Sequence, residues 1–201
     1  MSPLSRRAFT AAALTTLVAG CAGEETGNGA AASRRSGTPS AAESATRHGR
    51  SAPVRLRIPG IGVDTPVIRL GLAPDGTVRV PPVTPHDRVG WYEHSPTPGQ
   101  TGPSVLLGHV TVGAYGDGVF RRLGELRRGD RVEARLENGT TVGFAVTQVR
   151  TVAKADFPAE AVYGNVDRPE LRLITCGGPR DGAGYRDNVI VFAASTSAGE
   201  R

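Results

Sequence analysis

Three residues, His109, Cys176 and Arg186, combine side-chain types and positions that suit nucleophilic chemistry. His109 and Cys176 each end a short apolar run, and Arg186 lies just before another. The thiolate is the reactive form of cysteine, and it needs a neighbouring base or positive charge. An imidazole can transfer protons, and a guanidinium keeps its charge at any working pH. These residues are therefore our candidate active site, with Cys176 as the nucleophile.

The stretch from Leu171 to Phe192 is predicted to bring two of these residues together. It contains an apolar run that ends at Cys176, a glycine-rich segment, and a second apolar run that begins after Arg186. Short β-branched runs bounded by turn residues favour strands over helix. An antiparallel hairpin would return Arg186 to the rim where Cys176 lies, so that a thiol and a guanidinium share one edge of a sheet.

His109 is the one of four histidines that we place at the end of a strand. His48 falls in a low-complexity segment, and His86 and His94 fall in proline-rich loops. A purely structural histidine at a barrel rim is the alternative interpretation of His109. No close pair of ligands has the spacing of a zinc site, and no nucleophile-elbow motif of a serine hydrolase is present. We therefore expect no metal and no other cofactor.

Three segments resemble the signature segments of sortases. The run Arg172–Cys176 is similar to the TLxTC motif that carries the sortase cysteine, with Arg172 at the position where Thr is usual. Residues 106–109 (LLGH) resemble the strand that ends in the catalytic histidine, and residues 185–191 (YRDNVIV) resemble the segment that carries the arginine. Their order matches, and the resemblance covers residues 54–194. The Cys-Gly-Gly run and the helix-poor plan are most similar to actinobacterial class F sortases, with class E next.

The resemblance implies a cysteine transpeptidase that cuts an LPxTG-type sorting signal after Thr. Cys176 would form a thioacyl intermediate and pass the chain to an amine nucleophile of the cell envelope, from a peptidoglycan precursor or a pilin. His109 would protonate the leaving amine and later deprotonate the incoming one. Arg186 would bind the developing oxyanion or the peptide backbone.

Two other functions are weighed against this one. A catalytically silent, lipid-anchored binding lipoprotein of the envelope would account for a tether and a barrel, but not for His109, Cys176 and Arg186 together. A cysteine L,D-transpeptidase of peptidoglycan would carry a histidine shortly before its cysteine, whereas Cys176 follows Ile-Thr.

Four further residues are weaker candidates for the site. Thr175 would orient the site by hydrogen bonding, or it is an ordinary β-branched strand residue. By resemblance, the connection before the cysteine strand shapes the sorting-signal pocket. In that connection Phe157, Pro158 and Val162 would line the pocket or pack against the barrel. Too few carboxylates lie near this connection to hold a calcium ion.

The elements that must position these residues are predicted to be short strands. In Val54–Ile58, apolar residues and arginines alternate with the period of a half-buried strand. Asn138-Gly139, between two apolar runs, is the strongest short hairpin signal. A set of eight short strands with little helix indicates a small closed barrel, here an eight-stranded sortase-type β-barrel with one or two short helices. The predicted strands are 54–58, 63–70, 77–80, 103–109, 131–136, 140–152 and the two within 171–192, with a brief apolar element at 89–92 and helical turns at 119–126 and 159–163.

The N-terminal residues resemble targeting sequences. Arg6 and Arg7 precede an apolar stretch that is too short for an ordinary membrane-spanning helix, as in a twin-arginine signal. Residues 18–21 (VAGC) resemble a bacterial lipobox, which would make Cys21 the acylated first residue of the mature protein. Plain secretion, or an uncleaved anchor, with Cys21 unmodified is the alternative. We expect the protein on the extracytoplasmic face of the membrane.

Composition divides the chain into four parts. Residues 1–21 are the expected signal segment, 22–52 a disordered tether, 53–196 the catalytic barrel and 197–201 a disordered tail. The tether is rich in Gly, Ala, Ser, Thr and Arg and contains almost no large apolar residue. It cannot bury enough surface to offset the entropy lost on ordering.

The two cysteines and the charge pattern narrow the function further. If Cys21 carries lipid, Cys176 has no partner, and an unpaired thiol in an exported protein suggests a reactive role. An inert buried Cys176, or a disulfide between the two, is the alternative. The net charge of +5 comes from arginines scattered among acids, without a basic stripe interleaved with aromatic residues. We therefore expect no nucleic-acid partner.

Overall fold

The computed structural model describes residues 50–84, 88–182 and 184–196, and these residues form mostly β-structure. The strands are β1 (Pro53–Ile58), β2 (Val63–Leu70), β3 (Val89–Tyr92), β4 (Gly102–Leu107), β5 (Arg131–Leu136), β6 (Thr141–Ala153), β7 (Pro169–Asp181) and β8 (Gly184–Ser195). The helical elements are one α-helix, α2 (Ala159–Tyr163), and the 3-10 turns η1 (Pro59–Ile61), η2 (Gly113–Tyr115), η3 (Leu123–Glu125) and η4 (Lys154–Asp156).

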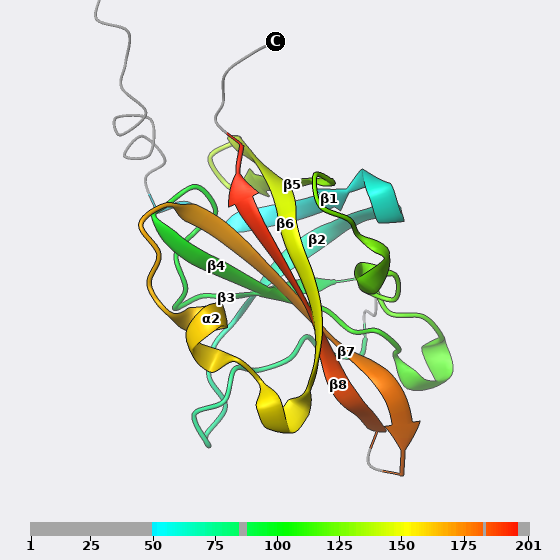
Figure 1. The fold of residues 1–201 in the computed structure, drawn as a ribbon. Helices are drawn as coiled ribbons and strands as arrows, with labels where there is room; N and C mark the ends of the chain where they lie inside the picture. The colour runs from blue at the N-terminus through cyan, green and yellow to red at the C-terminus, as the bar shows by residue number, and fades with distance from the viewer. Residues whose placement is uncertain (1–49, 85–87, 183, 197–201) are drawn as a thin grey trace, which may run out of the picture. The chain divides into compact units, whose positions relative to one another are not determined.

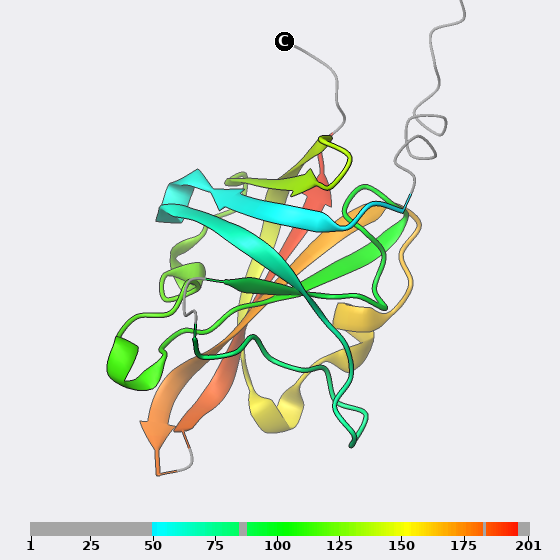
Figure 2. The same cartoon turned by 180° about the vertical axis from the view of Figure 1, so that it is seen from behind.

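The strands close into a barrel in the order β1-β2-β3-β4-β7-β8-β6-β5, seen from opposite sides in Figures 1 and 2. Two neighbouring pairs, β2 with β3 and β4 with β7, are parallel, and the other pairs are antiparallel. The β4–β7 pair matters most for the site, because it joins the predicted histidine strand to the predicted cysteine strand. The predicted fold class, a mostly β, closed eight-stranded barrel, is confirmed.

Apolar clusters cover both faces of the sheet around β4, β7 and β8. The main core fills the barrel, and β7 contributes Leu171 and Leu173, both fully buried. Alternate residues point outward, and α2 packs over them. This outer cluster consists of Val105, Ile174, Ile190 and Phe192 of the sheet and Val162 of α2. Cys176 follows Ile174 by two positions in β7 and therefore lies on the outer face.

Two local predictions are confirmed. The turn at Asn138-Gly139 joins the antiparallel strands β5 and β6, with Gly139 at a φ of 84°, where an L side chain would be strained. The predicted helical turn at 159–163 is α2. The helical turn predicted at 119–126 is shorter in the structure, where η3 covers three residues of that range.

The predicted strand at 77–80 is wrong, and β3 takes its place. Within that segment Val78 makes an isolated bridge with Leu72. Asp75 accepts hydrogen bonds from the main-chain N–H of Thr77 at 3.0 Å and from its hydroxyl at 2.7 Å, which closes a local turn. The apolar element at 89–92 is the full strand, because it pairs with β2 on one side and β4 on the other.

Strands β7 and β8 extend much further than predicted, so Cys176 lies within a strand and does not end one. The pairing continues to Asp181 and Gly184, as a hairpin that projects beyond the other strands in Figure 1. A bulge between Gly177 and Arg180 accommodates the extra residue in β7. Gly178 in this bulge has a φ of 72°, and a Cβ there would overlap the Asp187 side chain. The glycines therefore bend the hairpin without ending it.

The first described residues already pack against the barrel. Ser51 and Ala52, which we assigned to the end of the tether, are buried. Ser51 accepts a hydrogen bond from the N–H of Asn138, and Arg50 donates one to the carbonyl of Glu93. The expected signal segment, Cys21, the tether up to residue 49 and the tail at 197–201 lie outside the described residues. No helix within the described ranges is long and apolar enough to cross a membrane.

Candidate active site

The register of β4 against β7 brings His109 level with Cys176. The parallel ladder pairs Leu106 with Leu173 and Leu107 with Ile174. One further hydrogen bond, from the N–H of Gly108 to the carbonyl of Ile174 at 3.1 Å, continues the ladder beyond the end of β4. Extending this register by two residues places His109 beside Cys176, on the outer face in both chains.

The main chain at Gly108 and His109 contacts the buried residue Phe120 on the core side of the chain. The carbonyl of His109 accepts a hydrogen bond from the N–H of Phe120 at 2.9 Å. Phe120 is fully buried, and a Cβ on Gly108 would lie only 2.5 Å from its ring. The glycine before the histidine therefore lets the chain pass directly over the core, which fixes the place from which the imidazole projects.

Within the part of the chain that the structure describes, the imidazole of His109 has one hydrogen-bond partner, a main-chain carbonyl. Its Nε2 lies 2.7 Å from the carbonyl oxygen of Pro81, in the connection between β2 and β3. The sequence analysis did not predict this contact, because no motif in the connection between β2 and β3 indicates which of its residues lies next to His109.

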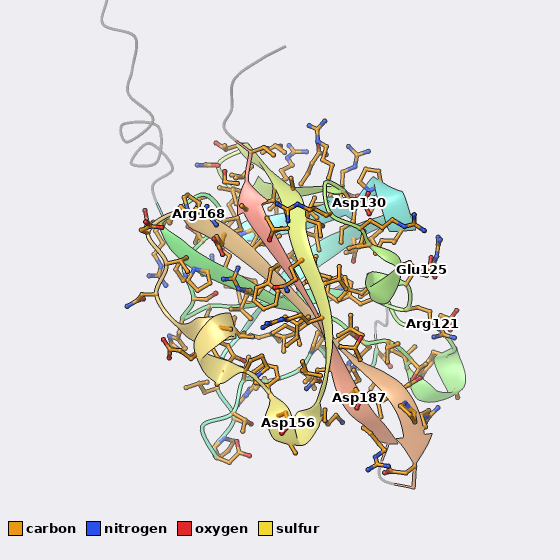
Figure 3. All side chains as sticks on the ribbon, in the orientation of Figure 1. Arg121, Glu125, Asp130, Asp156, Arg168 and Asp187 are labelled. Atoms are coloured by element: carbon orange, nitrogen blue, oxygen red, sulfur yellow. The ribbon has the colours of Figure 1, made fainter. Side chains whose placement is uncertain are left out.

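Cys176 is a free, partly buried cysteine at the wall of a hollow of about 190 Å³. Thr175 and the two following glycines line the same hollow. The hollow is also lined by Arg121, from the loop after β4, and by Glu125 of η3, both labelled in Figure 3. The thiol is therefore neither sealed in the core nor fully exposed.

Thr175 precedes the cysteine and faces the barrel side of β7. Its side chain is 4% exposed, and its hydroxyl has no hydrogen-bond partner among the described residues. A buried hydroxyl without a partner is unfavourable. Thr175 therefore lines the hollow with a side chain whose hydroxyl is itself buried.

Arg186 lies on the same hairpin as Cys176, but its guanidinium has another partner. Cys176 pairs across the hairpin with Asn188, and Arg186 precedes Asn188 by two positions in β8. The Nε of Arg186 lies 3.8 Å from a carboxylate oxygen of Asp181, and both side chains are more than half exposed. The hairpin therefore places Arg186 near the cysteine in the fold, with its charge paired to Asp181.

The predicted pocket residues follow β6 and differ in exposure. Val162 is fully buried in the outer cluster, so it supports the sheet from within α2. Phe157 is partly buried and packs against that cluster, and Pro158 is half-buried just before α2.

Two tyrosines that the sequence analysis did not predict, Tyr92 and Tyr163, also lie on this face. The Tyr163 ring lies 6.2 Å from that of Phe157 and 6.3 Å from that of Tyr92, between ring centroids. Burial, and to a lesser extent Tyr92, raise the pKa of Tyr163, so its hydroxyl stays neutral.

Arg172, the residue that departs from the TLxTC pattern, is a buried structural arginine. It is 3% exposed and lies 2.7 Å from a carboxylate oxygen of Glu170. Its Nε donates a hydrogen bond to the carbonyl of Ala161 in α2 at 3.2 Å, and its guanidinium lies 4.7 Å from the centre of the Phe192 ring. Arg172 therefore ties α2 to the outer face of the barrel.

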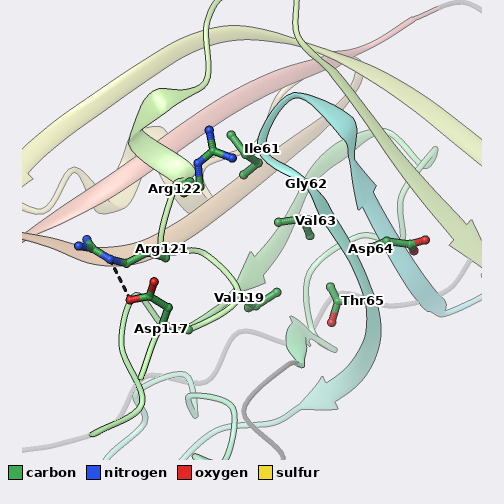
Figure 4. Close-up of a pocket in the computed structure, with 10 residues that line it drawn as sticks. Ile61, Gly62, Val63, Asp64, Thr65, Asp117, Val119, Arg121 and Arg122 are labelled. Atoms are coloured by element: carbon green, nitrogen blue, oxygen red, sulfur yellow. Dashed lines mark hydrogen bonds and ion pairs between the residues drawn. The ribbon is translucent and has the colours of Figure 1, made fainter. Parts of the chain in front are cut away.

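A second, larger hollow of about 340 Å³ shares Arg121 with the hollow at Cys176 (Figure 4). It is lined by the η1–β2 turn and by the loop that leads to η3. An ion pair between Arg121 and Asp117, at 3.1 Å, crosses its edge. None of the three candidate catalytic residues lines it, so it is not the candidate site. Among the described residues, no group of three or more His, Cys, Asp or Glu side chains could hold a metal ion.

Comparison with known proteins agrees with this architecture. The family model described as "Sortase domain" matches residues 56–196. The chain belongs to the sortase family. Sortase D of Bacillus subtilis (strain 168) is 31% identical over 121 residues, which are 60% of this chain and 52% of that protein. The chain thus spans about half the length of this curated relative.

Solved sortase structures share the fold at low sequence identity. A lid mutant of sortase A from Corynebacterium diphtheriae has a TM-score of 0.58 and 19% identity, covering 77% of this chain and 75% of its own. Sortase C-1 from Actinomyces oris has a TM-score of 0.56 and 23% identity, covering 72% and 74%. The resemblance to the sortase family is confirmed, and the neighbours include sortases A, C and D.

Proposed function

We propose that this sortase-family protein is a cysteine transpeptidase that cleaves an LPxTG-type sorting signal and transfers the chain to an amine of the cell envelope. The observation that supports the proposal is the β4–β7 register, which pairs Leu107 with Ile174, two residues before His109 and Cys176, and continues through the hydrogen bond from Gly108 to Ile174. The family match supports the same chemistry. A silent binding lipoprotein would need neither the alignment nor a free cysteine.

In the proposed reaction, the thiol of Cys176 gives its proton to His109, and the sulfur attacks the carbonyl carbon of the scissile peptide bond. The C–N bond breaks, and the leaving amine takes a proton from His109. The incoming amine then gives a proton to His109 and attacks the thioester. A new amide forms as the C–S bond breaks, and His109 passes the proton to the sulfur, which restores the thiol of Cys176. One histidine thus serves as acid in the first half-reaction and as base in the second.

Arg186 is the proposed stabiliser of the oxyanion, and it must leave Asp181 to act. An ion pair between exposed side chains contributes only about 0–1 kcal/mol, so exchanging Asp181 for a substrate oxygen costs little. The planar guanidinium can donate two N–H groups that converge on one carbonyl oxygen. The exposed pair with Asp181 is then the resting position of this arginine.

The apolar residues of the signal are proposed to bind over the outer cluster. Phe157, Tyr163 and Tyr92 form a partly exposed aromatic wall on this face, and Val162 supports it from below. Pro158 shapes the entry to α2. Leucine and proline side chains of a sorting signal would gain burial there.

The finer assignments are also proposals. The Cys-Gly-Gly run and the single α-helix among the described residues support class F, with class E as the alternative. The VAGC run supports lipidation at Cys21 and an extracytoplasmic, membrane-anchored location. Cys21→Ser should then release the protein from membranes or block its processing. A wild-type protein found free of membranes, with an unmodified Cys21, would disprove the anchor but not the catalysis.

The deciding experiment is single-turnover cleavage of labelled peptides from a panel of LPxTG-type signals, with mass spectrometry of the protein. The expected result is cleavage after Thr and an adduct of the acyl fragment on Cys176. Addition of candidate amines, such as a glycine oligomer, diaminopimelate or a lysine peptide, should convert the adduct into a ligated product. No cleavage of any peptide by the wild type would instead favour the binding lipoprotein.

A further inference from the structure

We propose that the main-chain carbonyl of Pro81 positions the imidazole of His109 and selects its reactive nitrogen. In this arrangement Nε2 carries the hydrogen, and Nδ1 is the atom that exchanges protons during the reaction. The assignment of the nitrogen stands on the contact itself. Its catalytic consequence rests on the proposed function.

The 2.7 Å contact between Nε2 and the Pro81 oxygen allows one assignment of the proton. A carbonyl oxygen can accept a hydrogen bond but cannot donate one, so Nε2 must be the donor. A neutral imidazole has a single N–H, and the free lone pair therefore lies on Nδ1. When the ring is protonated both nitrogens carry hydrogen, so Pro81 remains a suitable partner through the whole cycle.

The position of the connection between β2 and β3 suits this role. Strand β4 lies between β3 and β7 in the barrel, so His109 has the cysteine strand on one side and the β3 side on the other. The connection that contains Pro81 leads into β3, and Figure 2 shows it passing along the chain that leaves β4. The Pro81 carbonyl can therefore bind Nε2 from the β3 side, while Nδ1 is left for the side of the cysteine strand, β7.

Two consecutive prolines fix the direction of the Pro81 carbonyl. The ring of Pro81 fixes its φ, and the ring of Pro82 restricts the ψ of the residue before it to extended values. The base of the connection is closed by a hydrogen bond from the N–H of Arg79 to the carbonyl of Gly71, at 3.1 Å. Pro81 itself is buried, whereas Pro82 is exposed. The carbonyl is thus held in place largely before the imidazole binds it.

The first test reads the tautomer directly. The full chain is labelled with ¹⁵N, and long-range ¹H–¹⁵N correlations are recorded through neutral and mildly basic pH. The signals of His109 are assigned by their loss in His109→Gln. The expected pattern for the neutral ring is hydrogen on Nε2 and a bare Nδ1. A neutral ring with hydrogen on Nδ1 would overturn the proposal, whether or not the protein cleaves peptides.

The second test separates orientation from packing with two proline variants. Pro82→Gly removes an exposed ring but frees the ψ of Pro81, so we expect a mixture of tautomers and a kcat lowered about 10-fold to 100-fold with little change in KM. Pro81→Ala removes a buried ring but keeps both the carbonyl and the restriction by Pro82, so the Nε2–H tautomer should persist and the loss of kcat should be smaller. Pro74→Gly, an exposed proline earlier in the same connection, is the matched control and should behave as wild type.

The opposite order of effects would overturn the proposal. If only packing mattered, Pro81→Ala would be the more damaging change, and Pro82→Gly would leave the tautomer and kcat unchanged. If no wild-type cleavage were found, the tautomer measurement would still decide the positioning role. Failure of the positioning role and failure of the proposed function are therefore distinguishable.

Discussion

The N–H of Gly108 donates a hydrogen bond to the carbonyl oxygen of Ile174, 3.1 Å away, and this bond extends the parallel β4–β7 ladder beyond the last residue of β4. Because strand side chains alternate, the next step along both chains puts His109 and Cys176 side by side on the outer face. From this extension of the register we expect two residues that are far apart in the sequence to lie close together. The predictions below concern the groups around this pair.

Cys176→Ala should abolish both peptide cleavage and the acyl adduct, because the reaction has no other nucleophile. His109→Ala should be nearly as severe, since both half-reactions need its proton transfer. Neither change should alter folding, which circular dichroism and urea denaturation would check. Single-turnover rates on a labelled sorting peptide measure the effect. Cleavage by Cys176→Ala at the wild-type rate would mean that the chemistry lies elsewhere.

Arg186→Lys should slow cleavage about 10²-fold, because lysine keeps the charge but loses the planar pair of donors. Asp181→Asn should have a much smaller effect, within a few-fold of wild type, since it removes only the charge of the resting partner. Rates under kcat conditions would distinguish the two variants. An Arg186→Lys protein as active as wild type would exclude the oxyanion role.

Arg172→Met should destabilise the protein by about 3 kcal/mol, because it removes one partner of a buried ion pair and the bond to α2. Arg168→Met is the matched control, since Arg168 also binds Glu170, at 2.7 Å, but is 65% exposed. We expect Arg168→Met to destabilise the protein much less than Arg172→Met, because solvent screens this exposed ion pair. Urea denaturation measures both, and hydrogen exchange should show faster opening of α2 in Arg172→Met alone. Equal effects of the two variants would contradict the structural role of Arg172.

The free energy of unfolding should fall in acid, and protonation of Glu170 should account for part of this fall. Burial would raise the pKa of this carboxyl, but hydrogen bonds from Arg168 and Arg172, and their charges, lower it below its usual value. A lowered folded-state pKa stabilises the protein above the unfolded value, about 4.3, and this contribution is lost as the pH falls below it. Glu170→Gln should therefore flatten the stability curve below about pH 5.

The control for the acid prediction is Glu125→Gln. Arg122 also lowers the pKa of Glu125, but that pair is exposed and screened by solvent, so its removal should change the acid slope little. Urea denaturation at a series of pH values gives the slopes. An unchanged acid slope in Glu170→Gln would show that the buried pair does not couple to folding.

Gly178→Ala should destabilise the projecting hairpin by about 1–3 kcal/mol and reduce cleavage. The position has a positive φ, and the new Cβ would overlap Asp187, next to Arg186. Gly182→Ala is the control in the same hairpin, because a Cβ there meets no atom within 4 Å. Thermal unfolding and peptide cleavage would be compared for the two. A harmless Gly178→Ala would show that the bulge tolerates side chains.

Patterns that act over a few residues were sufficient to predict much of the fold. The alternation in Val54–Ile58, the Asn138-Gly139 turn and the helical turn at 159–163 all depend on local sterics and hydrogen bonds, and they can be read from neighbouring residues. The signature runs around His109 and Cys176 also identified the family, because a motif retains its residue order whatever the rest of the chain does.

Pairing between distant segments decided the rest. Whether 77–80 or 89–92 becomes a strand depends on which segment finds partners in β2 and β4, and neither partner is adjacent in sequence. The extension of β7 past Cys176 depends on β8 and on glycines that permit a bulge. In the same way, the burial of Arg172 beneath α2 and the contact of Pro81 with His109 join segments that are not adjacent in sequence. Local propensity carries no information about such contacts, because their free energy is gained only when the whole barrel closes.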